Sequence, residues 1–394
     1  MECFYCGNLL EETNASKEHI IQNALGGILE STKICCKKCN NFISKKLDVP
    51  FCAIFAPVVT QIDDMNQTNP SSRPSCEGKA ICTVDHQLYD VVIKGKQIID
   101  CVEYKRKYRS NISKTELNDK FKIVGYNFNL NNADFKNGIC KIALNYAIEC
   151  GVNNNVLKSN INISRDYDEI LDIDFKFPII PFYPLNAFDS FLELDTPFEL
   201  SHSLILFNIE NVLICFVDLF NTFQFYVVLS TEWCGREMYH PFYQVIEKID
   251  RSMPEFNIYR AKHVYTLATI YGVKPDLNVE NLRKDIATVI KKVPYKKSIG
   301  ELISKKISWQ YSRSSKYDTY NKYKSITFYL DDNESLREGR YKRFSPDIES
   351  NNACDIYAYP IRISDMLSDG LNINEYSNEK FKRLVTYLLN SQTK

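Results

Sequence analysis

Two short cysteine motifs, Cys3-Phe-Tyr-Cys6 and Cys36-Lys-Lys-Cys39, lie near the start of a chain of 394 residues. The thiolates of one CxxC motif can bind a metal ion at about 2.3 Å, and a second motif completes a tetrahedral Zn²⁺ shell. A filled shell of four cysteines leaves no position for water, so the predicted zinc is structural. Cys35 competes with Cys36 for one ligand position, and we prefer Cys36 because it gives two matching motifs. A redox-active dithiol is the alternative to a zinc site.

The segment between the two motifs is too short to form a hydrophobic core of its own, so a bound metal would stabilise its fold. It nevertheless carries a polar pair, Glu18-His19, followed by two isoleucines and by Gly26-Gly27 at a predicted turn. After the second motif, Asn40 and Asn41 begin a predicted helix. Polar residues in so small a segment are candidates for catalytic or ligand-binding roles, as well as for ordinary surface positions.

These residues resemble the HNH (ββα-metal) endonuclease family, in the variant with two CxxC zinc knuckles. The resemblance covers residues 3–48 and implies a β-hairpin carrying Glu18 and His19, packed on a helix carrying Asn40 and Asn41. It implies metal-dependent hydrolysis of DNA phosphodiester bonds, with His19 as general base. Glu18 and Asn40 would be oxygen ligands of one catalytic Mg²⁺ or Mn²⁺, and Asn41 is the alternative ligand. The residue types suit these roles, because histidine can be neutral near pH 7 and these hard cations prefer oxygen.

The sequence departs from the family pattern at three positions. Glu18 replaces the commoner Asp, and Gln22 stands where Pro is usual. No Asn between the glycine pair and the second cysteine motif can brace His19, and Ser31 and Thr32 are the nearest candidates. The alternative function is therefore a catalytically inactive zinc-knuckle module that binds DNA without cleaving it.

Asp48 ends the helix predicted over residues 40–48. At α-helical spacing it shares one face with Asn41 and Ser44, while Asn40 and Ser44 share another. Three roles are open for Asp48: to orient a metal ligand, to hold a metal-bound water, or to face solvent.

The whole chain is predicted to be an α+β protein in three parts. These are an N-terminal zinc-knuckled ββα-metal (HNH) module at 1–59, a middle β-rich α+β domain at 76–240, and a mixed helical, basic C-terminal region at 241–394. A polar stretch with prolines between the first two parts predicts a linker or long loop.

Three patterns give the middle domain its predicted elements. Alternation of apolar and polar residues over 78–103 predicts an antiparallel meander. Residues 139–150 have apolar side chains at helical spacing and are followed by Gly151, a suitable C-cap. The apolar run 203–220 is interrupted by Asn, Glu and Asp, so it predicts strands with a turn at Asn221-Thr222 rather than a membrane helix.

The charge of the chain is unevenly distributed. It has 49 basic and 49 acidic side chains, and this zero net charge argues against a uniformly basic nucleic-acid-binding protein. Residues 281–325, however, contain twelve basic, three acidic and six interleaved aromatic side chains. Positive charge beside aromatic rings is typical of contact with phosphates and unpaired bases. The alternative is a solvated basic face that acidic surface elsewhere balances.

DNA is the partner that the resemblance implies. A further hypothesis is a restriction or anti-phage defence effector, whose later domains respond to a regulatory ligand or a partner protein. The sequence shows neither a secretory signal nor an apolar run that could span a membrane, so we expect a cytoplasmic protein. The nine cysteines outside the first 39 residues are expected to be buried thiols. Four histidines without ligand spacing are expected to be ordinary core or surface residues: His86, His202, His240 and His263.

Overall fold

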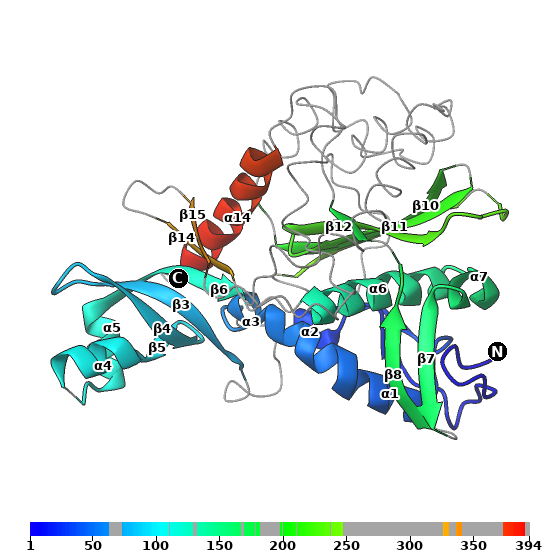
Figure 1. Ribbon diagram of the computed structural model, residues 1–394, viewed down its shortest axis with the longest axis horizontal. Coiled ribbons are helices and arrows are strands. Elements are labelled where there is room, and N and C mark those ends of the chain that lie inside the picture. Colours follow the sequence, from blue (N-terminus) through cyan, green and yellow to red (C-terminus); the bar gives the residue numbers. More distant parts are fainter. Residues whose placement is uncertain are drawn as a thin grey trace, which may run out of the picture.

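A computed structural model describes residues 1–62, 73–109, 111–128, 132–166, 169–177, 179–181, 198, 200–209, 211–236, 238–246, 326–330, 336–340 and 373–390. The basic segment 281–325 and His263 lie outside these residues. The described part is a mixed α+β structure, as predicted, with two larger antiparallel sheets and helices packed beside and between them (Figure 1). None of the described helices is long and apolar enough to cross a membrane.

The N-terminal segment is a short hairpin followed by a run of helices. Its elements are β1 (Glu18–His19), η1 (Asn23–Leu25), β2 (Glu30–Ser31), α1 (Lys37–Ile43), the π-helical η2 (Ser44–Asp48), α2 (Val49–Ile54) and α3 (Ala56–Val59). The helix predicted over 40–48 begins earlier, directly after Cys36, whose extended backbone forms the N-cap. It also continues beyond 48 into α2. Pro50 does not prevent this, because it lies in the first turn of α2, where its missing N–H is tolerated.

The first large sheet has six antiparallel strands in the order β15-β14-β6-β3-β4-β5. Its strands are β3 (Ser75–Cys82), β4 (Leu88–Lys94), β5 (Gln97–Asp100), β6 (Phe121–Phe128), β14 (Ile326–Leu330) and β15 (Leu336–Arg340). The predicted meander is confirmed as β3, β4 and β5. Helices α4 (Val102–Tyr108) and α5 (Lys114–Lys120) connect β5 to β6, and α14 (Ile373–Asn390) packs beside β14 (Figure 1).

The second large sheet has five antiparallel strands in the order β13-β10-β11-β12-β9. They are β9 (Ile179–Pro181), β10 (Ser201–Ile209), β11 (Val212–Leu219), β12 (Phe223–Ser230) and β13 (Tyr239–Val245). The apolar run 203–220 therefore forms strands, as predicted, and the chain turns at 220–222. Every residue of β11 and β12 is buried, which explains why these strands read as apolar runs without alternation. A separate hairpin joins β7 (Ile161–Asp166) to β8 (Glu169–Phe175).

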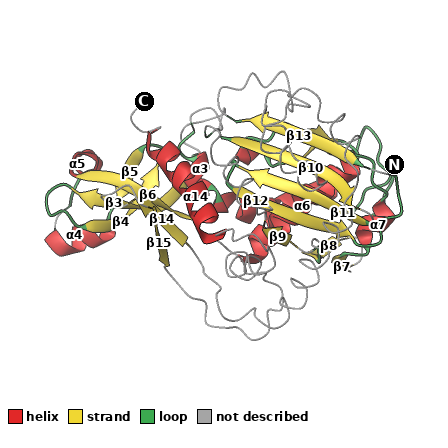
Figure 2. Cartoon of the chain, turned by 90° about the horizontal axis from the view of Figure 1, so that it is seen from above, coloured by secondary structure: helices red, strands yellow, loops and turns green. Residues whose placement is uncertain are grey.

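Helix α6 (Asn132–Glu149) occupies the centre of the molecule. It lies between the N-terminal helices and the five-stranded sheet, contacting α2 and η2 on one side and β10, β11 and β12 on the other (Figures 1 and 2). The helix begins earlier than the predicted 139. It ends as predicted before Gly151, whose φ of 87° is the left-handed conformation typical of a helix C-terminus. The short helix α7 (Asn154–Lys158) follows.

Aromatic side chains join these layers into one core. Phe55 contacts the rings of Phe220 and Phe223 at centroid distances of 5.3 and 5.0 Å. On the α6 side, a Cβ atom at Gly138 would lie only 2.1 Å from the ring of Phe51, so glycine allows α6 to approach the N-terminal helices closely. The N-terminal segment is thus packed directly against residues that lie far beyond it in the sequence, on both α6 and the five-stranded sheet.

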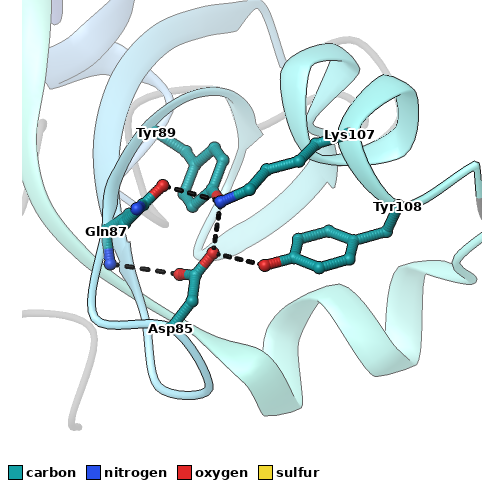
Figure 3. A network of polar contacts seen from close by, with 5 residues as sticks. All are labelled: Asp85, Gln87, Tyr89, Lys107 and Tyr108. Atoms are coloured by element: carbon teal, nitrogen blue, oxygen red, sulfur yellow. Dashed lines mark hydrogen bonds and ion pairs between the residues drawn. The ribbon is translucent and has the colours of Figure 1, made fainter.

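A polar network ties the turn between β3 and β4 to helix α4 (Figure 3). Oδ2 of Asp85 accepts hydrogen bonds from the hydroxyl of Tyr89 at 2.5 Å, from Nζ of Lys107 at 2.9 Å and from the hydroxyl of Tyr108 at 2.8 Å. Lys107 also donates to Oε1 of Gln87 at 2.7 Å. These hydrogen bonds, above all that from Tyr89, hold the pKa of the Asp85 carboxyl well below its usual range. The ionised form of Asp85 therefore favours the folded state.

We expect Asp85→Asn to lower the melting temperature at neutral pH, because it removes the charge that the network stabilises. A carboxyl with a depressed pKa stabilises the fold above its unfolded pKa of about 3.9 and loses this effect as the pH falls further. The difference in melting temperature between wild type and variant should therefore be constant above about pH 5 and narrow below about pH 4. Asp119→Asn is the control, since Asp119 is exposed on α5 and its side chain makes no hydrogen bond or ion pair with the described residues. A difference that is independent of pH down to pH 3 would contradict the assignment.

Candidate active site

The four predicted zinc ligands converge in the structure. The Sγ atoms of Cys3, Cys6, Cys36 and Cys39 all lie within 4.8 Å of one another, and those of Cys6 and Cys36 are 3.8 Å apart. Tetrahedral thiolates at about 2.3 Å from a zinc ion would be about 3.8 Å apart, so the donor set fits Zn²⁺. Cys35 is buried but does not belong to the cluster. Burial raises the pKa of the Cys35 thiol well above its usual value, which is typical of a neutral core residue.

The hairpin places His19 beside an acidic residue that the sequence did not reveal. In the antiparallel register, Glu18 pairs with Ser31 and His19 pairs with Glu30. Nε2 of His19 lies 3.2 Å from Oε1 of Glu30, so Glu30 braces the ring. Ser31, one of the two nearest candidates in the sequence, does not brace it, because its hydroxyl donates instead to Glu149 of α6 at 2.6 Å. The hairpin register, once known, is the signal that identifies Glu30.

A pocket of about 500 Å³ opens beside the hairpin. His19 and Glu18 line it from β1, and Asn40, Ser44 and Asp48 line it from α1 and η2. Apolar side chains, among them Val49, Ala53, Val59 and Pro74, also line it. The structure thus brings together three of the four predicted catalytic residues.

The fourth predicted catalytic residue, Asn41, is exposed and does not line the pocket. Of the two alternative metal ligands, Asn40 is therefore the one that faces the site. Its Nδ2 donates to the hydroxyl of Ser16 at 2.7 Å, which fixes the amide and leaves its oxygen for other contacts.

The π-helical turn of η2 alters the helix faces that were expected. The backbone N–H of Val49 donates to the carbonyl of Ser44, an i→i+5 hydrogen bond that widens the turn. Ser44 and Asp48 consequently line the pocket together with Asn40, whereas regular α-helical spacing had grouped Asp48 with Asn41. Of the three roles left open for Asp48, facing solvent does not apply, because its side chain is only 15% exposed and fully hydrogen-bonded.

Lys141 of α6 is the main feature of this site that the sequence did not reveal. Its Nζ donates to Oε1 of Glu18 at 2.5 Å and to both carboxylate oxygens of Asp48 at 2.7 and 2.9 Å. Burial alone lowers the pKa of Lys141, but Asp48 and Glu18 outweigh this effect and raise the pKa above its usual value. Asn145, one helical turn later, donates to the same Glu18 oxygen at 3.2 Å, and Gln22 donates to Asp48 at 2.8 Å. A Lys and an Asn four residues apart in the otherwise apolar stretch 139–148 of α6 are the signal that could have been noticed.

The loop that joins β1 to β2 is held by the five-stranded sheet. Nε2 of His202 on β10 donates to the carbonyl of Leu25 at 2.8 Å, while its Nδ1 accepts from the backbone of Phe220 at 3.3 Å. Burial lowers the pKa of His202 to about 4, so the ring is neutral and its role is structural, as predicted. Gln244 on β13 accepts from the N–H of Ile28 at 3.3 Å and donates to the carbonyl of Gly26 at 2.5 Å.

Comparison with known proteins gives one match. Residues 3–55 match the family model described as HNH endonuclease, which agrees with the resemblance found over 3–48 and extends it through α2. No curated protein and no solved structure is significantly similar to the chain. The matched segment contains the cysteine cluster, His19 and the pocket-lining residues of α1 and η2, and it ends well before Lys141.

The cysteine cluster predicts different effects for two adjacent substitutions. Cys36→Ser should reduce bound zinc from about one ion per chain to well below that and loosen the first fifty or so residues, because it removes one of four thiolates. Cys35→Ser should retain zinc, although a hydroxyl in this buried position will lower the melting temperature. Elemental analysis of the dialysed proteins, with circular dichroism, measures both effects. Equal zinc loss from the two variants would show that Cys35 is a ligand.

Proposed function

We propose that the N-terminal segment is a ββα-metal (HNH) nuclease that hydrolyses phosphodiester bonds in DNA. One observation carries the proposal: His19, Glu18 and Asn40 line a single pocket, and all three belong to the segment that matches the HNH endonuclease family. The adjoining four-thiol cluster is proposed to hold a structural zinc ion, since four cysteines complete its coordination.

In this proposal His19 is the general base. The contact of its Nε2 with Glu30 favours the tautomer with a proton on Nε2, which leaves Nδ1 free to accept a proton from the attacking water. Glu30 then stabilises the imidazolium that forms, as the carboxylate of a catalytic triad does. The side chain of His19 is 29% exposed, so both water and a DNA strand can reach it.

The donor chemistry of the pocket fits one Mg²⁺ or Mn²⁺ ion. Glu18 offers a carboxylate oxygen and Asn40 an amide oxygen, both of the hard type that these cations prefer. When bound, such a cation stabilises negative charge on the scissile phosphate. Asn40 is the preferred amide ligand over Asn41 because Asn41 does not line the pocket.

The remaining parts of the proposal concern the rest of the chain. The division at 1–59, 76–240 and 241–394 is proposed from composition, and the structure adds that β14 of the last part pairs with β6 of the middle part. A role as a restriction or anti-phage effector, with a regulatory ligand or partner protein, rests on the resemblance and on the length beyond the nuclease segment. Contact of the basic segment 281–325 with DNA rests on its charge and aromatic content.

Cleavage of plasmid DNA tests the proposed activity. With Mg²⁺ or Mn²⁺ present, we expect the wild type to cut and His19→Asn to lose about 10²- to 10⁴-fold in rate, the usual contribution of a general base. His86→Asn is the matched control, because His86 lies on a distant turn at φ 56°, a conformation that Asn tolerates. Wild-type protein that binds DNA but does not cut it with any divalent ion would favour the inactive binding module instead.

A further inference from the structure

Lys141 lies outside the segment that matches the nuclease family, yet it is in direct contact with the proposed site. It comes from α6, 123 positions beyond Glu18 in the chain. Its side chain is 1% exposed, and each of the three protons on its ammonium group has a carboxylate oxygen to bind. The contact is therefore a built part of the interior rather than a surface ion pair.

The two oxygens of Glu18 have different surroundings. Oε1 accepts hydrogen bonds from Lys141 and Asn145. Oε2 accepts none from the described residues, and Glu18 lines the pocket. Lys141 and Asn145 thus anchor one oxygen against α6 and leave the other for a ligand in the pocket.

Asp48 serves a different purpose from Glu18. Both of its oxygens are engaged by Lys141, and Oδ1 also accepts from Gln22. It is therefore the counterion that keeps Lys141 in place, rather than a further metal ligand. One ammonium between two carboxylates leaves the cluster with a net charge of −1, which suits a neighbouring divalent cation.

Stability alone is a poor explanation for such a cluster. Removing charged groups from water is costly, and apolar residues of similar volume often stabilise a core as well or better. Leu144, Tyr146 and Ala147 of the same helix are also buried, and they fill the core without placing a charge in it. A lysine at position 141 thus has a more specific use.

We propose that Lys141 is a positioning residue of the N-terminal site, which anchors Oε1 of Glu18 so that Oε2 alone is presented to the divalent cation. This inference rests on the proposed function, in which Glu18 is a metal ligand. It adds that the cation site is completed by α6, which lies outside the family-matched segment.

Binding of Mn²⁺ to the full, zinc-loaded chain tests the inference. It is measured by the electron paramagnetic resonance signal of the Mn²⁺ that remains free. Lys141→Met should weaken Mn²⁺ binding at least tenfold while zinc content stays at the wild-type level. Lys33→Met is the matched control. It removes an exposed ion pair with Glu149 of the same helix, away from the pocket, and should leave Mn²⁺ affinity unchanged.

A double variant separates positioning from charge and guards against misfolding. Lys141→Met alone leaves two buried carboxylates without a partner cation, whereas Lys141→Met with Asp48→Asn restores the net charge of −1. We expect the double variant to fold, to retain zinc and still to bind Mn²⁺ at least tenfold more weakly than the wild type, because Glu18 is no longer anchored.

The outcomes distinguish this inference from the proposed function. Wild-type affinity in the double variant would mean that Lys141 only balances charge, and tighter binding would mean that it competes with the cation; either result overturns the inference alone. A zinc-loaded wild type that binds no Mn²⁺ overturns both. His19→Asn should slow cleavage by about 10²- to 10⁴-fold and leave Mn²⁺ binding intact, which tests the nuclease independently of Lys141.

Discussion

The ion pairs of Lys141 with Glu18 and Asp48 constrain how the two halves of the core fit together. A buried ammonium must find acceptors in a neighbouring element, so α6 can meet the N-terminal segment with only one of its faces. The opposite face of α6 then meets the five-stranded sheet, where the hydroxyl of Tyr146 donates to the carbonyl of His240 on β13 at 3.1 Å. One charged residue therefore fixes the rotation of the helix that lies between the nuclease-like segment and the five-stranded sheet.

The hairpin of the candidate site consequently depends on residues far along the chain. Its first strand is held through Glu18 by Lys141, and its second through Ser31 by Glu149. The loop between the strands is held by two residues of the sheet, including His202. A segment of some fifty residues has little core, and a metal centre alone fixes only the ends of its long insert. The packing against α6 and the sheet supplies the rest of its rigidity.

The sequence predicted correctly those features that depend on residues close together in the chain. Spacing identified the four thiols that converge, because the two thiols of each CxxC motif can bind one metal ion through local geometry alone. The strands of 203–220 followed from apolar runs broken by polar residues. It failed for Glu30, which depends on the register of a hairpin with a ten-residue connection, and for Lys141, which depends on tertiary packing. The partners of these two residues cannot be assigned until the fold is known.

The π-helical turn can be understood from the two ends of the same helix. At its start, Cys36 and Cys39 belong to the four-thiol cluster, which fixes the direction in which Asn40 projects. At its end, Asp48 is fixed by Lys141. A regular α-helix would rotate Asp48 away from the face of Asn40 by about 80° over these eight residues. The wider turn with its i→i+5 bond removes much of that rotation, so both anchors are satisfied and Ser44 lies between them on the pocket wall. The π-helical turn is thus what brings Asp48 and Ser44 onto the same pocket wall as Asn40.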